Sequence, residues 1–303
     1  MYHNPVLLQA SLEGLQLKPD GVYVDCTFGG GGHSKAILEQ LGENGKLFAF
    51  DQDPDAWQNE LTHDARFTLI KLNFRHLSRG LRMHKQQKVD GILADLGVSS
   101  HQFDTADRGF SLRFDGPLDM RMNPTIGISA ADWLAQADEA SLIRVLREYG
   151  EVPNARRLAQ AILARQQLQP FQRTLELATF LEAFAPKQKW HAYKAQVFQA
   201  LRIEVNGELD ALRELLQASL DVLHLEGRMV IISYHSLEDR MVKHFMREGW
   251  LDGDAERDEK GRRHFRLRAV HRKPIAADDA EIEGNSRARS ARLRTAERVE
   301  AWI

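Results

Sequence analysis

The sequence has few of the features that mark secreted, metal-cluster or membrane proteins. A single cysteine, Cys26, in 303 residues excludes an internal disulfide framework and a metal site built from several cysteines, and we predict no metal site. The longest strand-like apolar run is Met229–Ile232, so no membrane span is predicted. No basic segment near the N-terminus leads into a long apolar one, so we expect no secretory signal and a cytoplasmic protein.

The net charge is also small, but the charges are unevenly distributed. The chain has 41 Lys+Arg against 43 Asp+Glu, a formal net charge of -2. Residues 257–298 contain 13 Lys+Arg and 7 Asp+Glu, so this stretch is basic and the remainder is acidic. Its Arg-x-Arg spacings favour an anionic partner, because guanidinium groups match phosphate geometry. The alternative is a solvated surface laced with ion pairs.

Short apolar runs alternate with segments of helical length in the first half of the chain. We expect strands over 22–25, 46–50, 67–71 and 89–94, and later strands over 228–233 and 264–270. Strands that alternate with helices are typical of βαβ units, so the pattern predicts an α/β fold with a doubly wound parallel sheet. Residues 287–299 are expected to form a short helix or an arm.

No strand signal interrupts residues 129–224, where apolar residues recur at helical spacing. We therefore predict an all-helical insertion, residues 108–207, that divides one domain into the parts 1–107 and 208–303. A long loop rich in Gly, Pro, Asp and Arg, residues 104–124, leads into the insertion, and loops of that length are usually functional or disordered.

Four glycines, Gly29–Gly32, lie between the first expected strand and the helix after it. Glycine permits a tight turn and lets a ligand approach the backbone closely. Asp51 follows 19 residues after Gly32, at the end of the second strand, where a carboxylate can accept both hydroxyls of a ribose. This spacing predicts a nucleoside-containing cofactor; the alternative is a glycine-rich turn without a ligand.

The residues around the glycines favour S-adenosylmethionine over a nicotinamide dinucleotide. A dinucleotide fingerprint requires Gly-x-Gly-x-x-Gly, and this loop fits it only with Ser34 in the third place. Asp25 precedes the loop and suits a cofactor that carries a positive group rather than a pyrophosphate. S-adenosylmethionine has a ribose, an amino group and a sulfonium, and no phosphate.

Polar residues follow two later strands. Asp95 ends the fourth strand, where ligand and catalytic groups collect, although it could also cap the next turn. Tyr234 and His235 are expected to face the same crevice, and Ser236 with Asp239 resembles an acidic capping box that opens a helix. Covalent attack on carbon 5 of a pyrimidine requires a nucleophilic cysteine, and the only cysteine, Cys26, lies beside the glycine loop on the cofactor side, which argues against that route.

Motifs distributed in order over nearly the whole chain identify a known family. They are His3–Leu8, Asp25–Ser34, Asp51–Pro54, Asp90–Ser100, Arg108–Ser111, Gly116–Met122, Phe198–Asn206, Ile232–Arg240 and Arg287–Arg294. With these motifs the chain resembles the bacterial small-subunit rRNA cytosine-N4 methyltransferases, the MraW or RsmH family. It departs from the family's usual pattern at Gln196, where many members have an arginine, and at Ser286, where many have a proline.

The resemblance implies a class I, Rossmann-like methyltransferase that transfers a methyl group from S-adenosylmethionine directly to the exocyclic amine of a cytidine. The cytidine would lie in the decoding region of 16S rRNA, within the small ribosomal subunit. The family's cofactor contacts fall here on Gly31, Gly32, His33, Asp51, Phe74, Asp95 and Gln102. The insertion would be the RNA-substrate domain.

We expect RNA contacts from the loop 104–122 and the basic stretch 287–294, with candidates Arg108, Arg113, Arg121, His235, Arg287 and Arg289. The tetrad of many amino-methyltransferases is absent, since Asp95-Leu-Gly-Val stands in its place, and no catalytic residue is assigned. Two other classes stay open at this point: a nicotinamide-dependent oxidoreductase, and an RNA-binding module with an inactive cofactor pocket. The oligomeric state is also open.

Overall fold

The computed structural model describes residues 5–252 and 257–302, which form two compact units. The first unit combines residues 1–97 and 209–303, and the second comprises residues 98–208. The helical unit thus begins ten residues before the predicted boundary at 108. The reason is that Val98 and Phe103 pack against the apolar core of the second unit.

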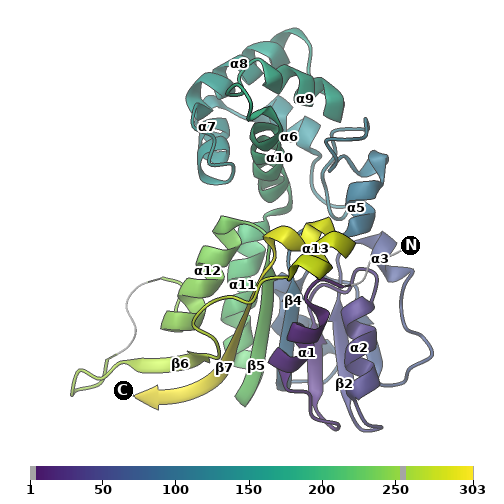
Figure 1. The fold of residues 1–303 in the computed structure, drawn as a ribbon, viewed down its shortest axis with the longest axis vertical. Helices are drawn as coiled ribbons and strands as arrows, with labels where there is room; N and C mark the ends of the chain where they lie inside the picture. Colours follow the sequence, from purple (N-terminus) through teal and green to yellow (C-terminus); the bar gives the residue numbers. More distant parts are fainter. Residues whose placement is uncertain (1–4, 253–256, 303) are drawn as a thin grey trace. The chain divides into compact units, whose positions relative to one another are not determined.

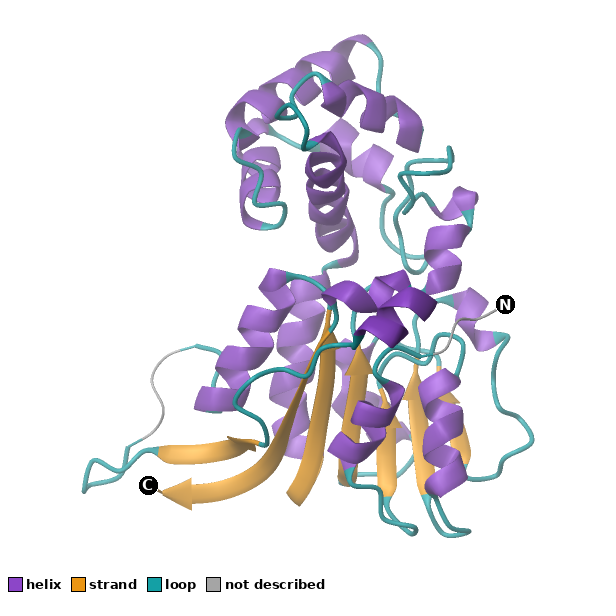
Figure 2. Ribbon diagram, in the orientation of Figure 1, coloured by secondary structure: helices purple, strands orange, loops and turns teal. Residues whose placement is uncertain are grey.

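A seven-stranded sheet forms the centre of the first unit (Figure 2). Its strands are β1 Val22–Asp25, β2 Lys46–Phe50, β3 Phe67–Ile70, β4 Val89–Asp95, β5 Leu223–Ser233, β6 His264–Ala269 and β7 Arg292–Trp302. They lie in the order β3-β2-β1-β4-β5-β7-β6. The first five in this order pair in parallel, and β7 is antiparallel to both of its neighbours. The predicted α/β doubly wound fold is confirmed, but the sheet is mixed rather than wholly parallel, because β7 runs antiparallel.

Helices cover both faces of the parallel part of the sheet, which explains why β1, β2 and β4 are largely apolar, whereas β6 and β7 carry charged residues. The helices of this unit are α1 Leu8–Leu15, α2 Gly32–Gln40, α3 Pro54–Trp57, α4 Leu77–Met83, α11 Glu208–Val222, α12 Ser236–Glu248 and α13 Asp279–Gly284. Helices α1 and α2 lie over one face of the sheet (Figure 1). Leu93 of β4 packs in a core with side chains of these two helices. Its neighbours Ile92 and Ala94 pack in a second core with α4, α11 and α12.

The second unit is helical, as predicted. It contains α5 Ser100–Asp104, α6 Ala130–Gln136, α7 Glu139–Glu148, α8 Ala155–Leu168, α9 Thr174–Glu182 and α10 Trp190–Asn206. The apolar residues expected on single helical faces, among them Leu142, Leu146, Leu177 and Leu181, are buried in one core. No helix within the described residues is long and apolar enough to cross a membrane.

The basic segment near the C-terminus is not the helix or arm expected from the sequence. After a short 3-10 turn, Ser286–Ser290, it forms β7, which pairs with β5 from Arg228 opposite Glu297 to Ser233 opposite Arg292. Leu293 and Ala296 of β7 are fully buried, while Arg294 pairs with Asp239 of α12. Partners that lie far away in the sequence therefore hold this charged segment as a strand.

If β7 belongs to the core, truncating its buried leucine must cost stability. The Leu293 side chain is 0% exposed, so we expect Leu293→Ala to lower the free energy of unfolding by about 2–5 kcal/mol. Urea denaturation measures this change. As a control, Arg289→Ala alters an exposed side chain and is expected to stay within about 0.5 kcal/mol. A Leu293→Ala protein as stable as its parent would contradict the strand assignment.

Candidate functional site

The glycine loop joins the end of β1 to the start of α2 and depends on left-handed backbone. Gly29 has φ +51° and Gly31 has φ +75°, values that side chains other than glycine rarely adopt. A Cβ at Gly31 would lie 3.0 Å from the Phe28 ring, whereas a Cβ at Gly29 would meet only the Thr27 carbonyl oxygen, at 4.0 Å. The space beside the Gly29 Cα is therefore open, while the Gly29 N–H and carbonyl oxygen are bonded within the protein, to Asp51 and Asn59.

Asp25 has a structural role that the sequence interpretation did not foresee. Its carboxylate is 1% exposed and accepts hydrogen bonds from Ser34 Oγ, at 2.7 Å, and from the Thr27 backbone N–H, at 3.1 Å. Thr27 Oγ1 in turn accepts the Asp95 backbone N–H at 2.7 Å. Asp25 thus anchors the loop to α2, which argues against the expected direct role in holding a positive group.

Asp51 lies immediately after β2 and is bonded to the glycine loop. Its Oδ2 accepts the Gly29 backbone N–H and its Oδ1 accepts the Asp53 backbone N–H, both at 2.8 Å. Burial raises the pKa of Asp51 to about 6, against the opposing effect of these two donors. Each carboxylate oxygen keeps a further lone pair, so the side chain can still accept ligand hydroxyls.

Phe74 follows β3 at the same edge of the sheet. It begins a 3-10 turn, Phe74–His76, whose cap residue Asn73 donates from Nδ2 to Gln52 Oε1 at 2.8 Å. This bond joins the segment after β3 to the segment after β2, where Asp51 lies. The Phe74 ring is partly buried against the core. The structure therefore joins the segment that carries Phe74 to the segment that carries Asp51, although no spacing in the sequence singled Phe74 out.

Asp95 is the centre of a polar group at the end of β4. Tyr234 Oη donates to Asp95 Oδ1 at 2.7 Å, and His33 Nδ1 lies 4.0 Å from Asp95 Oδ2. Burial raises the pKa of Asp95 to about 6, while His33 and the Tyr234 hydroxyl oppose that increase. Burial and the adjacent Asp95 carboxylate also raise the pKa of Tyr234, so its hydroxyl remains a donor.

The N-terminal segment closes one side of the loop through His33. His33 is buried, and its Nε2 lies 3.1 Å from the Val6 carbonyl oxygen, so Nε2 carries a proton. A Cβ at Gly32 would lie 2.3 Å from Pro5 Cγ, so this glycine is required for close packing inside the protein. Gly32 and His33 thus contact the segment 5–6, which the sequence interpretation did not include in the site.

The polar residues after β5 are arranged differently from the predicted capping box. His235, rather than Ser236, is the N-cap of α12, and its partner is Glu238 rather than Asp239. Glu238 Oε2 accepts the Tyr234 backbone N–H at 2.9 Å, and Asp239 pairs with Arg294. His235 therefore caps a helix, while the predicted approach of Tyr234 to Asp95 is confirmed.

Gln102 belongs to the helical unit, residues 98–208. Its side chain is buried, and its Oε1 accepts the Ser99 backbone N–H at 3.0 Å in a capping box at the start of α5. Its cofactor contact stays a prediction.

Two of the arginines expected to contact RNA in the loop 104–122 bond within the protein. Arg108 is buried and donates to the carbonyl oxygens of Arg121 and Met122, at 3.1 and 2.8 Å. Arg121 forms a two-pronged ion pair with Asp119, with bonds of 2.8 and 2.6 Å. Arg113 is exposed. Because Arg108 and Arg121 bond within the protein, fewer of their N–H groups can bond an RNA. The RNA contacts of Arg108, Arg113 and Arg121 remain predictions.

Several arginines of the basic C-terminal stretch are paired with carboxylates within the protein. Their pairs include Arg262–Asp258, Arg263–Glu248, Arg268–Glu297, Arg294–Asp239 and Arg298–Glu300. Arg289 is exposed and Arg287 is partly buried in the turn before β7. The RNA contacts predicted for Arg287 and Arg289 stay predictions.

Comparison with known proteins extends over nearly the whole chain. A model of the MraW methylase family matches residues 1–299. The ribosomal RNA small subunit methyltransferase H of Cytophaga hutchinsonii is 54% identical over 299 residues, covering 98% of this chain and 100% of the relative. The proteins of the same name from Flavobacterium johnsoniae and Bacteroides thetaiotaomicron are 52% and 50% identical, each over 98% of this chain and 98% and 97% of the relative.

The surroundings of Asp95 predict the pH at which its carboxyl titrates. In the ligand-free protein the Asp95 carboxyl should titrate near pH 6, and Tyr234→Phe should raise that pKa further, because it removes a bond that favours the carboxylate. Carbon-13 NMR of the aspartate carboxyls measures both values. Tyr193→Phe, which removes a hydroxyl bonded to Asn154 in the helical unit, is the control.

The raised pKa of Asp95 also predicts how the stability of the folded protein changes with pH. Because folding raises the pKa of Asp95 above its ordinary value of 3.8, its ionisation disfavours the folded state. The contribution of Asp95 to stability is therefore greatest below about pH 4 and decreases up to about pH 6. An Asp95 carboxyl that titrates near 3.8 and does not respond to Tyr234→Phe would contradict this picture.

Proposed function

The chain belongs to the MraW methylase family and is a methyltransferase, and from that premise we propose its reaction. It transfers the methyl group of S-adenosylmethionine to the exocyclic N4 of a cytidine in 16S rRNA of the small ribosomal subunit. The observation that carries this proposal is the identity of 54% to a ribosomal RNA small subunit methyltransferase H over the full length of that relative. Family membership also argues against the nicotinamide-dependent oxidoreductase.

The site residues of the first unit fit S-adenosylmethionine by the chemistry of their groups. The open space beside Gly29 and the carboxylate of Asp51 suit an adenosine ribose, and Phe74 offers an apolar face for adenine. Asp95 places a second carboxylate at the end of β4, which suits the positive amino end of the cofactor. Gly31, Gly32 and His33 give the loop its shape, and we include Gln102 as a further contact.

The position of these groups follows from the strand order. The order reverses between β1 and β4, and in open α/β sheets ligands bind at such a reversal, beyond the carboxyl ends of the strands. The glycine loop follows β1 and Asp95 ends β4. A cofactor bound between them would contact residues from three strand ends, those of β1, β2 and β4.

When bound, S-adenosylmethionine supplies an electrophilic methyl group on a sulfonium. The task of the protein is then to hold the cytosine N4 in line with that methyl group, since positioning can supply most of the rate. The amine is a weak nucleophile because its lone pair is delocalised into the ring, so acceptors for its N–H groups assist the transfer. The base must leave its stack to reach the site.

We further propose that the helical unit, residues 98–208, contributes to RNA binding, and that the target lies in the decoding region. Exposed Arg113 and Arg289 are the better candidates among the arginines selected from the sequence, because Arg108 and Arg121 have internal partners. Such a reaction would take place in the cytoplasm.

The Asp51 carboxylate should be required for cofactor binding and not for folding. Asp51→Ala is expected to weaken S-adenosylmethionine binding by about 10-fold or more, since each hydrogen bond to a charged group contributes roughly 1.5–3 kcal/mol. Titration calorimetry measures the affinity, and circular dichroism checks the fold. Asp64→Ala, which removes a carboxylate paired with Arg66 in the same unit, is the control. Tight binding of NADH without binding of S-adenosylmethionine would overturn the cofactor assignment.

The modified nucleoside tests the reaction itself. Deleting the gene should remove one N4-methylated cytidine from 16S rRNA, and expression of the parent protein should restore it. Nucleoside mass spectrometry of purified 16S rRNA detects the change. If N4-methylation is unaltered by the deletion, the protein is an RNA-binding module with an inactive pocket rather than the proposed enzyme.

A further inference from the structure

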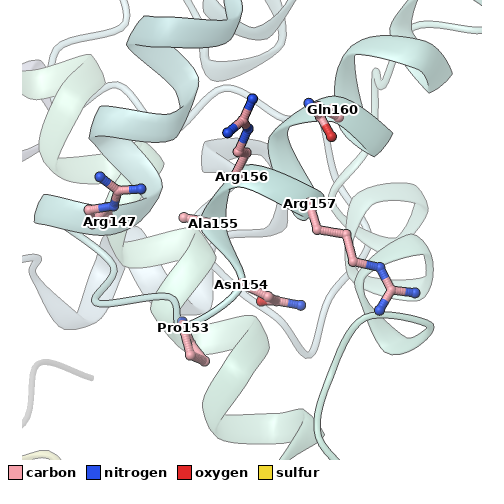
Figure 3. Close-up of a pocket in the computed structure, with 7 residues that line it drawn as sticks. All are labelled: Arg147, Pro153, Asn154, Ala155, Arg156, Arg157 and Gln160. Atoms are coloured by element: carbon pink, nitrogen blue, oxygen red, sulfur yellow. The ribbon is translucent and has the colours of Figure 1, made fainter.

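A surface cavity in the helical unit is lined by three arginines (Figure 3). It has a volume of about 370 Å³ and lies where the end of α7 meets the start of α8. Arg147 comes from the last turn of α7, and Arg156 and Arg157 from the first turn of α8. Pro153, Asn154 and Gln160 complete its lining. We call it the arginine pocket.

The arginine pocket gathers positive charge in a unit whose other arginines are mostly paired. Residues 98–208 contain 13 Lys+Arg and 13 Asp+Glu, so the unit has no net charge by composition. Most of its other arginines bond within the protein, as in the pairs Arg121–Asp119, Arg144–Glu204, Arg173–Asp115 and Arg202–Glu208. Among the ion pairs of the described residues, none includes Arg147, Arg156 or Arg157.

The first turn of α8 contains two arginines, Arg156 and Arg157. Its first turn contains no acidic side chain, although carboxylates are the groups that a helix N-terminus favours. Asn154, at the cap position, makes no capping bond, because its Oδ1 accepts from Tyr193 Oη at 2.7 Å and its Nδ2 donates to the Phe184 carbonyl oxygen at 3.2 Å. Two arginines therefore lie at the positive end of a helix dipole, an arrangement that an anion would stabilise.

The three arginines differ in what they can reach. Figure 3 shows Arg147 and Arg156 extending from the two helices on either side of Ala155, while Arg157 extends away from them. Arg157 lies over the Phe184 ring, 5.8 Å from its centroid. Glu139 accepts from Gln160 at 2.9 Å, which places one carboxylate at the rim. Arg147 and Arg156 are thus the principal groups for an anion.

We propose that the arginine pocket binds the phosphate backbone of the RNA substrate. This proposal rests on the proposed function and assigns it a specific contact. The pocket is an exposed, open surface with charged forks and no buried polar group to select a base, which is the chemistry of a phosphate contact rather than of sequence reading. The pocket offers positive charge to an RNA. By contrast, Arg108 and Arg121, which the sequence suggested as RNA contacts, are bonded to groups within the protein.

The test compares two double variants of equal charge. Arg147→Gln with Arg156→Gln removes the principal pocket charges, and Arg79→Gln with Arg82→Gln removes two exposed arginines from α4 as the matched control. Binding of the complete protein to purified 16S rRNA is measured over a range of KCl concentrations. The pocket variant should bind about 10-fold more weakly and lose about 1–2 from the slope of log K against log salt, while the control changes little.

The outcomes distinguish a failure of the phosphate contact from a failure of the proposed methyltransferase reaction. Unchanged affinity and slope in the pocket variant would overturn the phosphate contact, even where wild-type protein methylates cytidine. A loss of binding to the assembled small subunit without a loss for naked rRNA would overturn it in favour of an acidic protein surface. Unaltered S-adenosylmethionine binding and melting temperature show that the variant is folded. Arg147→Lys with Arg156→Lys keeps the charge and should restore most of the salt slope.

Discussion

The buried carboxylate of Asp25 connects the glycine loop, the start of α2 and the end of β4. A carboxylate that is 1% exposed is costly unless hydrogen bonds replace its water. Ser34 Oγ and the Thr27 backbone supply those bonds, and the Thr27 hydroxyl then accepts the backbone N–H of Asp95. This chain of bonds sets the path of the loop at the strand ends. Asp51, bonded to Gly29, and Tyr234, bonded to Asp95, are attached to that same framework.

The sheet explains why polar side chains gather around this framework. Both faces of the sheet are covered by helices, so the strand ends are where polar side chains can collect without being buried in an apolar core. The reversal of strand order between β1 and β4 leaves room at those ends. The chain leaves the first unit after Gly97, shortly beyond Asp95, and returns at Leu209. Along the chain, the helical insertion thus begins three residues after Asp95.

Electrostatics in this protein depend on pairing rather than on composition. Residues 257–298 have the larger excess of positive charge, yet Asp239, Glu248 and Glu297 form ion pairs with arginines of that stretch. The helical unit has no net charge, yet Arg147 and Arg156 line an open cavity. A count of charges along the chain therefore does not show which charges are available to a partner, since neighbours in space decide which of them are paired.

The sequence by itself determined the elements that depend on local pattern. The strands 22–25 and 46–50 were predicted to the residue, because a strand buried on both faces is a continuous apolar run. The loop glycines and the position of Asp51 after β2 followed from the same reasoning, whereas Phe74 came only from the family resemblance. Only the tertiary structure decided that residues 292–302 form a strand, that His235 rather than Ser236 caps α12, and which arginines are paired. The physical reason is range: apolar periodicity and glycine are local properties, whereas ion pairs and strand partners join residues far apart in the chain.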